Sequence, residues 1–197
     1  MPNLVRNCTA LGVVFAVILL TACETIRQTG EESAAVSIAR EVALQLPPVP
    51  GYEGRLEAVQ TVVASHETRK TAFQATLSAD AERVDIVMVA LNGPRIMEIA
   101  WTENGVEETR YAYTPENLSG LNVLADIFLV FWPQAKVSEA LPKGVSLEEA
   151  DNSRKIRYGG TTIIEIRYDV ASEGGRQYQE LTNLDLGYSL KIYSQSP

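Results

Sequence analysis

The stretch that decides the fold of this 197-residue chain reads Leu118-Ser119-Gly120-Leu121-Asn122-Val123-Leu124-Ala125-Asp126-Ile127-Phe128-Leu129-Val130-Phe131-Trp132-Pro133. Its apolar residues recur at helical spacing and also cover the other faces, which predicts a helix buried nearly all round. Thr114 and Pro115 supply an N-cap and a first helical position, and Pro133 ends the helix. The helix cannot span a bilayer, because Asn122 and Asp126 interrupt a run that is already too short.

Segments on both sides of this helix alternate apolar and polar residues with period two, the pattern of β-strands. Turn residues such as Asn92-Gly93-Pro94 and Gly159-Gly160 separate them. About five antiparallel strands are expected before the helix and about five after it. They cover residues 55–62, 70–77, 83–91, 95–101, 107–113, 145–150, 154–158, 161–169, 177–182 and 188–194.

Two shorter helices complete the expected elements. Residues 33–46 carry apolar side chains at helical spacing (Val36, Ala39, Ala43, Leu46), with Ser33 as a possible N-cap, and prolines follow directly. A short helix is also expected at 137–141. The predicted fold is mainly β (α+β): an incompletely closed antiparallel β-barrel of about ten strands, with a buried helix and an N-terminal helix. The alternative is a two-sheet sandwich with a helix at one end.

The N-terminus reads as an export signal. An apolar run from Ala10 to Leu20 ends in Leu20-Thr21-Ala22-Cys23, which resembles the bacterial lipobox. The resemblance implies cleavage before Cys23 and lipidation of that cysteine, so that two or more acyl chains anchor the protein stably. Glu24, which stands where Asp retains lipoproteins at the inner membrane, favours the periplasmic face of the outer membrane. The expected divisions are a signal peptide at 1–22, a lipidated tether at 23–32 and a single domain at 33–197.

Composition excludes several classes of partner. The chain has 17 basic and 25 acidic residues and a formal net charge of −8, which disfavours both nucleic acid and anionic-lipid surfaces as electrostatic partners. Cys8 leaves with the signal peptide and Cys23 is lipidated, so the exported domain has no disulfide and is stabilised by its core alone.

The sequence shows no constellation of catalytic or metal-binding residues. His66 is the only histidine, which leaves no triad and no zinc site. Glu148, Glu149 and Asp151 lack the spacing of a calcium loop and are expected to lie on a solvated face. We therefore expect neither an enzyme nor a metal or other cofactor.

A set of apolar side chains is the remaining candidate for a binding site. The buried helix carries more apolar surface than packing on one sheet face would cover. A hydrophobic pocket for acyl groups is therefore a reasonable hypothesis. The alternative is that these side chains fill a core. The candidate cavity residues are Met88, Met97, Trp101, Leu124, Phe128, Phe131, Trp132, Ile164, Ile166 and Tyr168.

Several segments resemble an uncharacterised family of small bacterial lipoproteins: 89–97, 126–133 with Leu141-Pro142, 154–158, 163–168 and 183–192. Trp132-Pro133 and the closing Gly187-Tyr188-Ser189-Leu190-Lys191-Ile192 are the most specific pieces. That family is similar to the LolA/LolB lipoprotein carriers and is often found near aryl polyene biosynthesis genes. The resemblance implies an unclosed barrel lined with apolar groups and lidded by helices.

Two functions remain open at this point. In the first, the domain is a LolA/LolB-like barrel that holds an acyl chain, a lipid or a lipidated protein, received in some cases from a soluble periplasmic carrier, and passes it to the outer membrane. In the second, the protein is a non-catalytic accessory lipoprotein that docks on an envelope assembly or biosynthetic complex. An open, dry cavity favours the first, and a filled interior with an exposed apolar patch favours the second.

Overall fold

The computed structural model describes residues 25–28, 34–171 and 177–195, and all statements below concern these residues. The signal peptide and Cys23 lie outside them. In chain order the elements are β1 (Thr25–Gln28), β2 (Ala35–Ala39), β3 (Val42–Gln45), β4 (Leu56–His66), β5 (Arg69–Ala79), β6 (Val84–Ala90), β7 (Arg95–Thr102), β8 (Gly105–Arg110), α1 (Gly120–Phe131), α2 (Gln134–Ala140), β9 (Val145–Ala150), β10 (Ser153–Tyr158), β11 (Thr161–Ala171), β12 (Gln177–Asn183) and β13 (Tyr188–Gln195).

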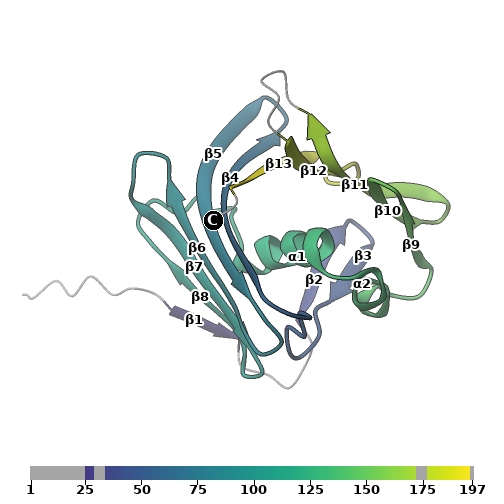
Figure 1. Ribbon diagram of the computed structural model, residues 1–197, viewed down its shortest axis with the longest axis horizontal. Coiled ribbons are helices and arrows are strands. Elements are labelled where there is room, and N and C mark those ends of the chain that lie inside the picture. The colour runs from purple at the N-terminus through teal and green to yellow at the C-terminus, as the bar shows by residue number, and fades with distance from the viewer. Residues whose placement is uncertain (1–24, 29–33, 172–176, 196–197) are drawn as a thin grey trace, which may run out of the picture.

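Two antiparallel meanders, β4–β8 and β9–β13, make up most of one sheet. Within the described residues this sheet has eleven strands in the order β1-β8-β7-β6-β5-β4-β13-β12-β11-β10-β9, and β2 pairs with β3 separately. The last strand, β13, joins the meanders by pairing with β4. The sheet curls around α1, which lies on its concave side (Figure 1).

The predicted strands and the buried helix are confirmed. Each of the ten expected strands is found, and the short helix expected at 137–141 is α2. The sheet does not close, because β1 and β9 are its two edges. The predicted incompletely closed barrel therefore fits the observed curved and open sheet only approximately. The segment expected to be a tether contributes β1, which pairs with β8.

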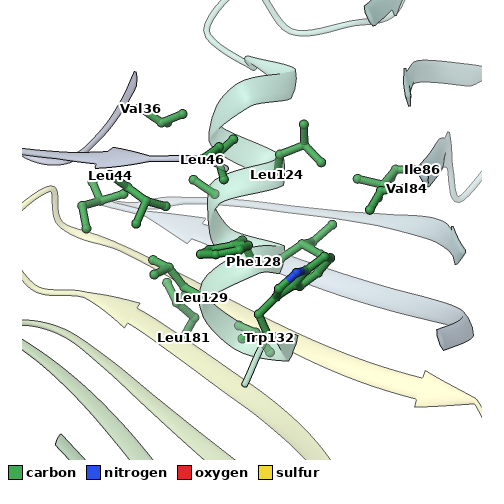
Figure 2. Close-up of a cluster of buried hydrophobic side chains, with 14 of the residues drawn as sticks. Val36, Leu44, Leu46, Val84, Ile86, Leu124, Phe128, Leu129, Trp132 and Leu181 are labelled. Atoms are coloured by element: carbon green, nitrogen blue, oxygen red, sulfur yellow. The ribbon is translucent and has the colours of Figure 1, made fainter. Parts of the chain in front are cut away.

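The predicted N-terminal helix is wrong: residues 35–45 form the β2–β3 hairpin, with Arg40 and Glu41 at its turn. Val36 and Ile38 on one strand and Leu44 on the other are at most 3% exposed, which is a period-two pattern. The same segment satisfied a helical spacing by chance, and the β-branched residues at alternate positions were the better indication. The hairpin lies against α1, with Val36, Leu44 and Leu46 beside the helix (Figure 2).

The main helix begins later than predicted. Its N-cap is Ser119, and Thr114 instead serves a turn, where its Oγ1 accepts a hydrogen bond from the backbone N–H of Tyr111 at 3.0 Å and donates to the carbonyl of Ile96. The guanidinium of Arg110 donates to the carbonyls of Pro115 and Leu118, which holds the segment before the helix in a turn. The cation Arg110 thus helps to set where α1 begins, and the apolar periodicity of the helix gives no sign of it.

An aromatic cluster forms the centre of the core between α1 and the sheet. The ring of Trp132 lies 6.0 Å from Trp101 and 5.3 Å from Phe128, measured between ring centroids. Its indole N–H donates to the carbonyl of Pro50 at 2.7 Å, which ties the segment before β4 to the end of α1. Figure 2 shows Phe128 and Trp132 next to each other, with Leu46 and Leu129 beside the helix.

Candidate functional site

The structure brings the ten candidate cavity residues into one apolar interior. Eight of them are at most 2% exposed: Met88, Met97, Trp101, Leu124, Phe128, Trp132, Ile164 and Ile166. Phe131 and Tyr168 are partly buried and pack against the same core. These side chains pack between α1 and the inner face of the sheet. That they line a ligand cavity stays a prediction.

Polar contacts hold α1 in this interior at both ends. The carboxylate of Glu108 on β8 accepts the backbone N–H of Gly120 at 2.7 Å, and so supplies the cap that Ser119 does not. At the other end the guanidinium of Arg154 on β10 donates to the carbonyl of Leu129 at 2.5 Å. The hydroxyl of Tyr168 donates to the carbonyl of Val130 at 3.0 Å. An anion at the helix N-terminus and a cation at its C-terminus both suit the helix dipole.

A further polar contact lies in the middle of α1. The hydroxyl of Tyr188, at the start of β13, donates to Oδ1 of Asp126 at 2.7 Å. Burial raises the pKa of Asp126 to about 7, although the bond from Tyr188 acts in the opposite direction. Burial and the neighbouring Asp126 also raise the pKa of Tyr188, so this hydroxyl stays protonated. The pair is a polar contact between the helix and the sheet that responds to pH.

Beside this pair, α1 leaves part of the inner sheet face uncovered. Phe73 on β5 lies opposite the buried Val62, and Leu190 on β13 lies opposite the buried Leu181, so both point inward. Both are only partly buried, as is Val123, which lies one helical turn before Asp126. Phe73, Val123, Tyr188 and Leu190 together are called the cup mouth below. It is an apolar surface with one ionisable carboxyl at its edge.

A small pocket of about 260 Å³ lies at the other side of the helix, near its first turn. Its lining mixes apolar residues with the Arg110–Glu108 ion pair, which is 2.7 Å between Nη1 and Oε1. Ligand pockets usually measure about 300–1,000 Å³ and are mostly apolar. The lining residues are Val106, Glu108, Arg110, Glu116, Asn117, Leu118, Ser119 and Leu121.

His66, opposite Tyr188 on the neighbouring strand, and the acidic residues Glu148 and Glu149 form no catalytic group with one another. His66 is exposed at the end of β4, and Glu149 forms an ion pair with Arg154. Glu148 pairs with Arg157 at 3.5 Å. Within the part of the chain that the structure describes, no group of three His, Cys, Asp or Glu side chains could hold a metal ion. None of the helices there is long and apolar enough to cross a membrane.

The sequence reasoning missed most of the cup mouth and of the polar contacts of α1. Phe73 and Leu190 alternate like every other inward residue of their strands, so nothing in the pattern marks them as partly exposed. Asp126 did carry an indication, because a carboxyl within an otherwise apolar helix needs a partner. Tyr188, the partner, lies 62 residues away in sequence and could only be found from the fold.

Gly120 is required by the close approach of α1 to β8. A Cβ at this position would lie 2.6 Å from Oε2 of Glu108 and 3.2 Å from Cγ1 of Ile99. Gly→Ala in a helix normally stabilises by about 1 kcal/mol. We expect Gly120→Ala instead to lower the free energy of unfolding by about 1–3 kcal/mol, since overpacking costs this much. Urea unfolding measures it.

The matched control for Gly120→Ala is Ser119→Ala. Losing an N-cap serine usually costs about 1 kcal/mol, but the side chain of Ser119 makes no capping bond. Ser119→Ala is therefore expected to be close to neutral. A stabilised Gly120→Ala, or a normal capping loss at Ser119, contradicts the described helix start.

Asp126 makes stability depend on pH. Its folded pKa of about 7 lies above the ordinary value of 3.8, so the folded state keeps a proton that the unfolded state releases. The free energy of unfolding therefore falls as the pH rises from about 4 to about 7, by on the order of 1–3 kcal/mol. Asp126→Asn cannot ionise, and we expect it to flatten this slope and to be more stable than wild type at pH 8. Urea unfolding at several pH values measures both effects.

A second variant checks the sign of this effect. The bond from Tyr188 lowers the pKa of Asp126, so Tyr188→Phe should raise that pKa and extend the falling slope to higher pH. Retention of the full wild-type slope in Asp126→Asn would show that another group is responsible.

Comparison with known proteins identifies the family but no curated relative. No curated protein matches the chain. Among solved structures, it is similar to the crystal structure of the LolA superfamily protein NE2245 from Nitrosomonas europaea, with a TM-score of 0.41 and 8% identity over 75% of this chain and 86% of that one. The family described as "Protein of unknown function (DUF3261)" matches residues 57–196, which include α1 and both meanders. The chain therefore belongs to the DUF3261 family.

Proposed function

We propose that this protein is a lipid-anchored periplasmic protein of the outer membrane that binds an acyl chain and delivers it to that membrane. This acyl chain is part of a lipid or of a lipidated protein. The observation that carries the proposal is the cup mouth, where Phe73 and Leu190 face inward and, like Val123 on α1, are apolar and only partly buried. Each Å² of apolar surface removed from water contributes about 25 cal/mol, so an acyl chain laid on this surface is stabilised without specific contacts.

The polar contacts of α1 suit a movable plug. Outside its apolar packing, the polar contacts that hold the helix include Glu108 at its start, Tyr188 in the middle, and Arg154, Tyr168 and the bond from Trp132 to Pro50 at its end. The cup mouth lies at the middle contact. An acyl chain that enters there extends between α1 and the sheet towards the candidate residues of the core, and the helix moves outward to make room. Because those core residues are fully packed in the present state, binding requires this movement.

The lipid anchor determines where the cup works. Lipidation at Cys23, followed by Glu24, directs the protein to the inner face of the outer membrane. The anchor raises the effective concentration of the cup near the bilayer, which favours hand-over from a soluble carrier. The resemblance to lipoproteins encoded beside aryl polyene genes makes a polyene lipid one candidate cargo. No catalysis, metal or cofactor is needed for this function.

The proposal is tested by titrating a fluorescent fatty acid into the exported chain, residues 24–197, after circular dichroism has established that it is folded. Wild type is expected to bind the probe saturably. Leu190→Arg places a charge in the cup mouth and should weaken binding by about tenfold or more, which is a change of about 1.4 kcal/mol. The matched control is Ser189→Arg, the neighbouring position on the outer face of β13. Folded wild type without saturable binding, or equal weakening by both variants, would overturn the proposal.

A second function is favoured by the packing of the core. Eight of the ten candidate cavity residues are at most 2% exposed, as expected for an interior filled by its own side chains. In that case the protein is a non-catalytic accessory lipoprotein that docks on an envelope assembly or biosynthetic complex. The probe titration separates the two functions, because an accessory protein with a filled interior binds no fatty acid saturably.

A further inference from the structure

The two ends of the curved sheet differ in chemistry. In an antiparallel meander successive connections alternate between the two ends of the sheet. The turns β4–β5, β6–β7, β10–β11 and β12–β13, with the segments after β8 and before β9, therefore lie at one end, called the apolar rim below. Pairing of His66 with both Arg69 and Tyr188 confirms this alignment across the junction of the meanders.

Exposed large apolar side chains gather at the apolar rim. Leu91 in the β6–β7 turn is 61% exposed and Leu184 in the β12–β13 turn is 55% exposed. Tyr113, after β8, is 69% exposed, and Tyr158, at the end of β10, is 38% exposed. The other two such residues in the described chain are valines: Val49 in the segment before β4 and Val59 within β4. Four large apolar or aromatic side chains at one end of the sheet are thus more exposed than a packed core requires.

The described turns at the opposite end are acidic. They contain Asp80 and Glu82 with one cation, Arg83, between β5 and β6, Glu103 between β7 and β8, and Asp151 between β9 and β10. When the strand residues next to these connections are counted, together with the β2–β3 turn, where the backbone N–H of Arg40 donates to Asp185, the apolar rim carries more cations than anions in spite of the overall charge of −8. Its cations are Arg40, Arg69, Lys70, Arg95, Lys143 and Arg157, and its anions are Glu41, Glu67, Glu116 and Asp185.

The N-terminal chain enters the sheet at the same rim. β1 runs antiparallel to β8, with Thr25 opposite Thr109 and Gln28 opposite Val106. The chain therefore enters β1 at the end where β8 leaves the sheet towards Tyr113. Cys23 precedes Thr25 by two residues, which span at most about 7 Å. The expected lipidation site is thus only two residues from a described residue, Thr25, at the apolar rim.

From these observations we infer that the apolar rim is the face that this protein lays on an anionic phospholipid bilayer, with Leu91, Tyr113, Tyr158 and Leu184 entering the interface. Leucine and tyrosine side chains gain from burial at the boundary between headgroups and acyl chains, and cations near an anionic surface are attracted to it. The acidic end then faces the periplasm. The cup mouth lies near the apolar rim, because Tyr188 belongs to the row of His66 and Arg69. This inference deepens the proposed function, since it rests on the lipid anchor and places the cup entrance at the bilayer.

The test uses the full chain purified from membranes, in which the acylated Cys23 offers no free thiol. Leu91→Cys and Leu184→Cys report on the apolar rim, and the exposed control positions Asn104→Cys and Asn152→Cys report on the acidic end. Each variant is labelled with an environment-sensitive fluorophore and mixed with vesicles of phosphatidylcholine and phosphatidylglycerol, some containing spin-labelled phospholipid. We expect blue-shifted emission and strong quenching at positions 91 and 184, with water-like emission at 104 and 152.

Three outcomes overturn this orientation: water-like emission at all four positions, quenching at 104 or 152, or quenching at one rim position only. Equal quenching in vesicles of phosphatidylcholine alone overturns the part assigned to anionic lipid. The fatty-acid titration, run on the exported chain, is independent of this readout. Quenching at the rim without saturable fatty-acid binding contradicts the proposed function but supports the membrane orientation. Fatty-acid binding without quenching at the rim supports the proposed function but contradicts the orientation.

Discussion

Trp132→Ala is expected to lower the free energy of unfolding by about 3–5 kcal/mol, the range for a large aromatic side chain removed from a packed core. Trp132 is 1% exposed and contacts the rings of Trp101, Phe128 and Tyr52. Its removal leaves a cavity where α1 meets the sheet, and it also leaves the carbonyl of Pro50 without the indole N–H that it accepts. Urea unfolding followed by circular dichroism measures the loss.

Two further variants separate the causes of this loss. Trp132→Phe keeps most of the ring volume but removes the hydrogen bond to Pro50, which should cost about 1–2 kcal/mol. Tyr113→Ala removes an aromatic side chain that is 69% exposed, and we expect a change within about 0.5 kcal/mol. A loss below about 1 kcal/mol for Trp132→Ala contradicts the described core.

Arg154→Met is expected to cost about 2–4 kcal/mol, because breaking a buried ion pair leaves uncompensated polar groups. The side chain of Arg154 is 5% exposed. Its guanidinium bonds the carbonyl of Leu129 and the carboxylate of Glu149, and both lose their donor in the variant. Methionine keeps the apolar stem, so the loss reports on the charge and its hydrogen bonds. Urea unfolding measures it.

Arg157→Met, three positions further along β10, is the matched control. Arg157 is 36% exposed and its ion pair with Glu148 measures 3.5 Å. Exposed ion pairs contribute about 0–1 kcal/mol, so the control should be nearly neutral. Equal losses for the two variants would contradict the role of Arg154 as the cation at the end of α1.

The sequence predicted the framework well because period-two alternation and turn residues survive folding as local patterns. Ten expected strands and the buried helix are present. The failure at 33–46 arose from a segment in which Val36 and Leu46 fit two periods, and in which the β-branched residues at alternate positions were the better indication of strands. The helix start was misplaced for a similar reason, since Arg110 and Glu108 reach it from a neighbouring strand.

The candidate site was predicted in part. Phe128, Trp132 and Ile164 pack in one interior, as apolar helices do against inward strand residues, and their role as the lining of a cavity stays a prediction. The same pattern cannot tell a filled core from a surface that α1 leaves uncovered. Phe73 and Leu190 alternate as core residues do, and their partial exposure follows from where the helix ends up in the curved sheet. Likewise, the sequence does not show that Leu91 and Leu184 lie at the same end of the sheet. This follows only from the strand order, which places the β6–β7 and β12–β13 turns there.

The central claim, that the inner sheet face receives an acyl chain at the cup mouth, is tested most directly by lipid identification. The full chain is purified from its own membrane without delipidation, and bound molecules are identified by mass spectrometry. Wild type and Ser189→Arg are predicted to carry an acyl lipid, distinct from the covalent anchor, at about one per protein, and Leu190→Arg is predicted to lose it. Wild-type protein that is folded and carries no such lipid, or equal lipid in all three proteins, would contradict the claim.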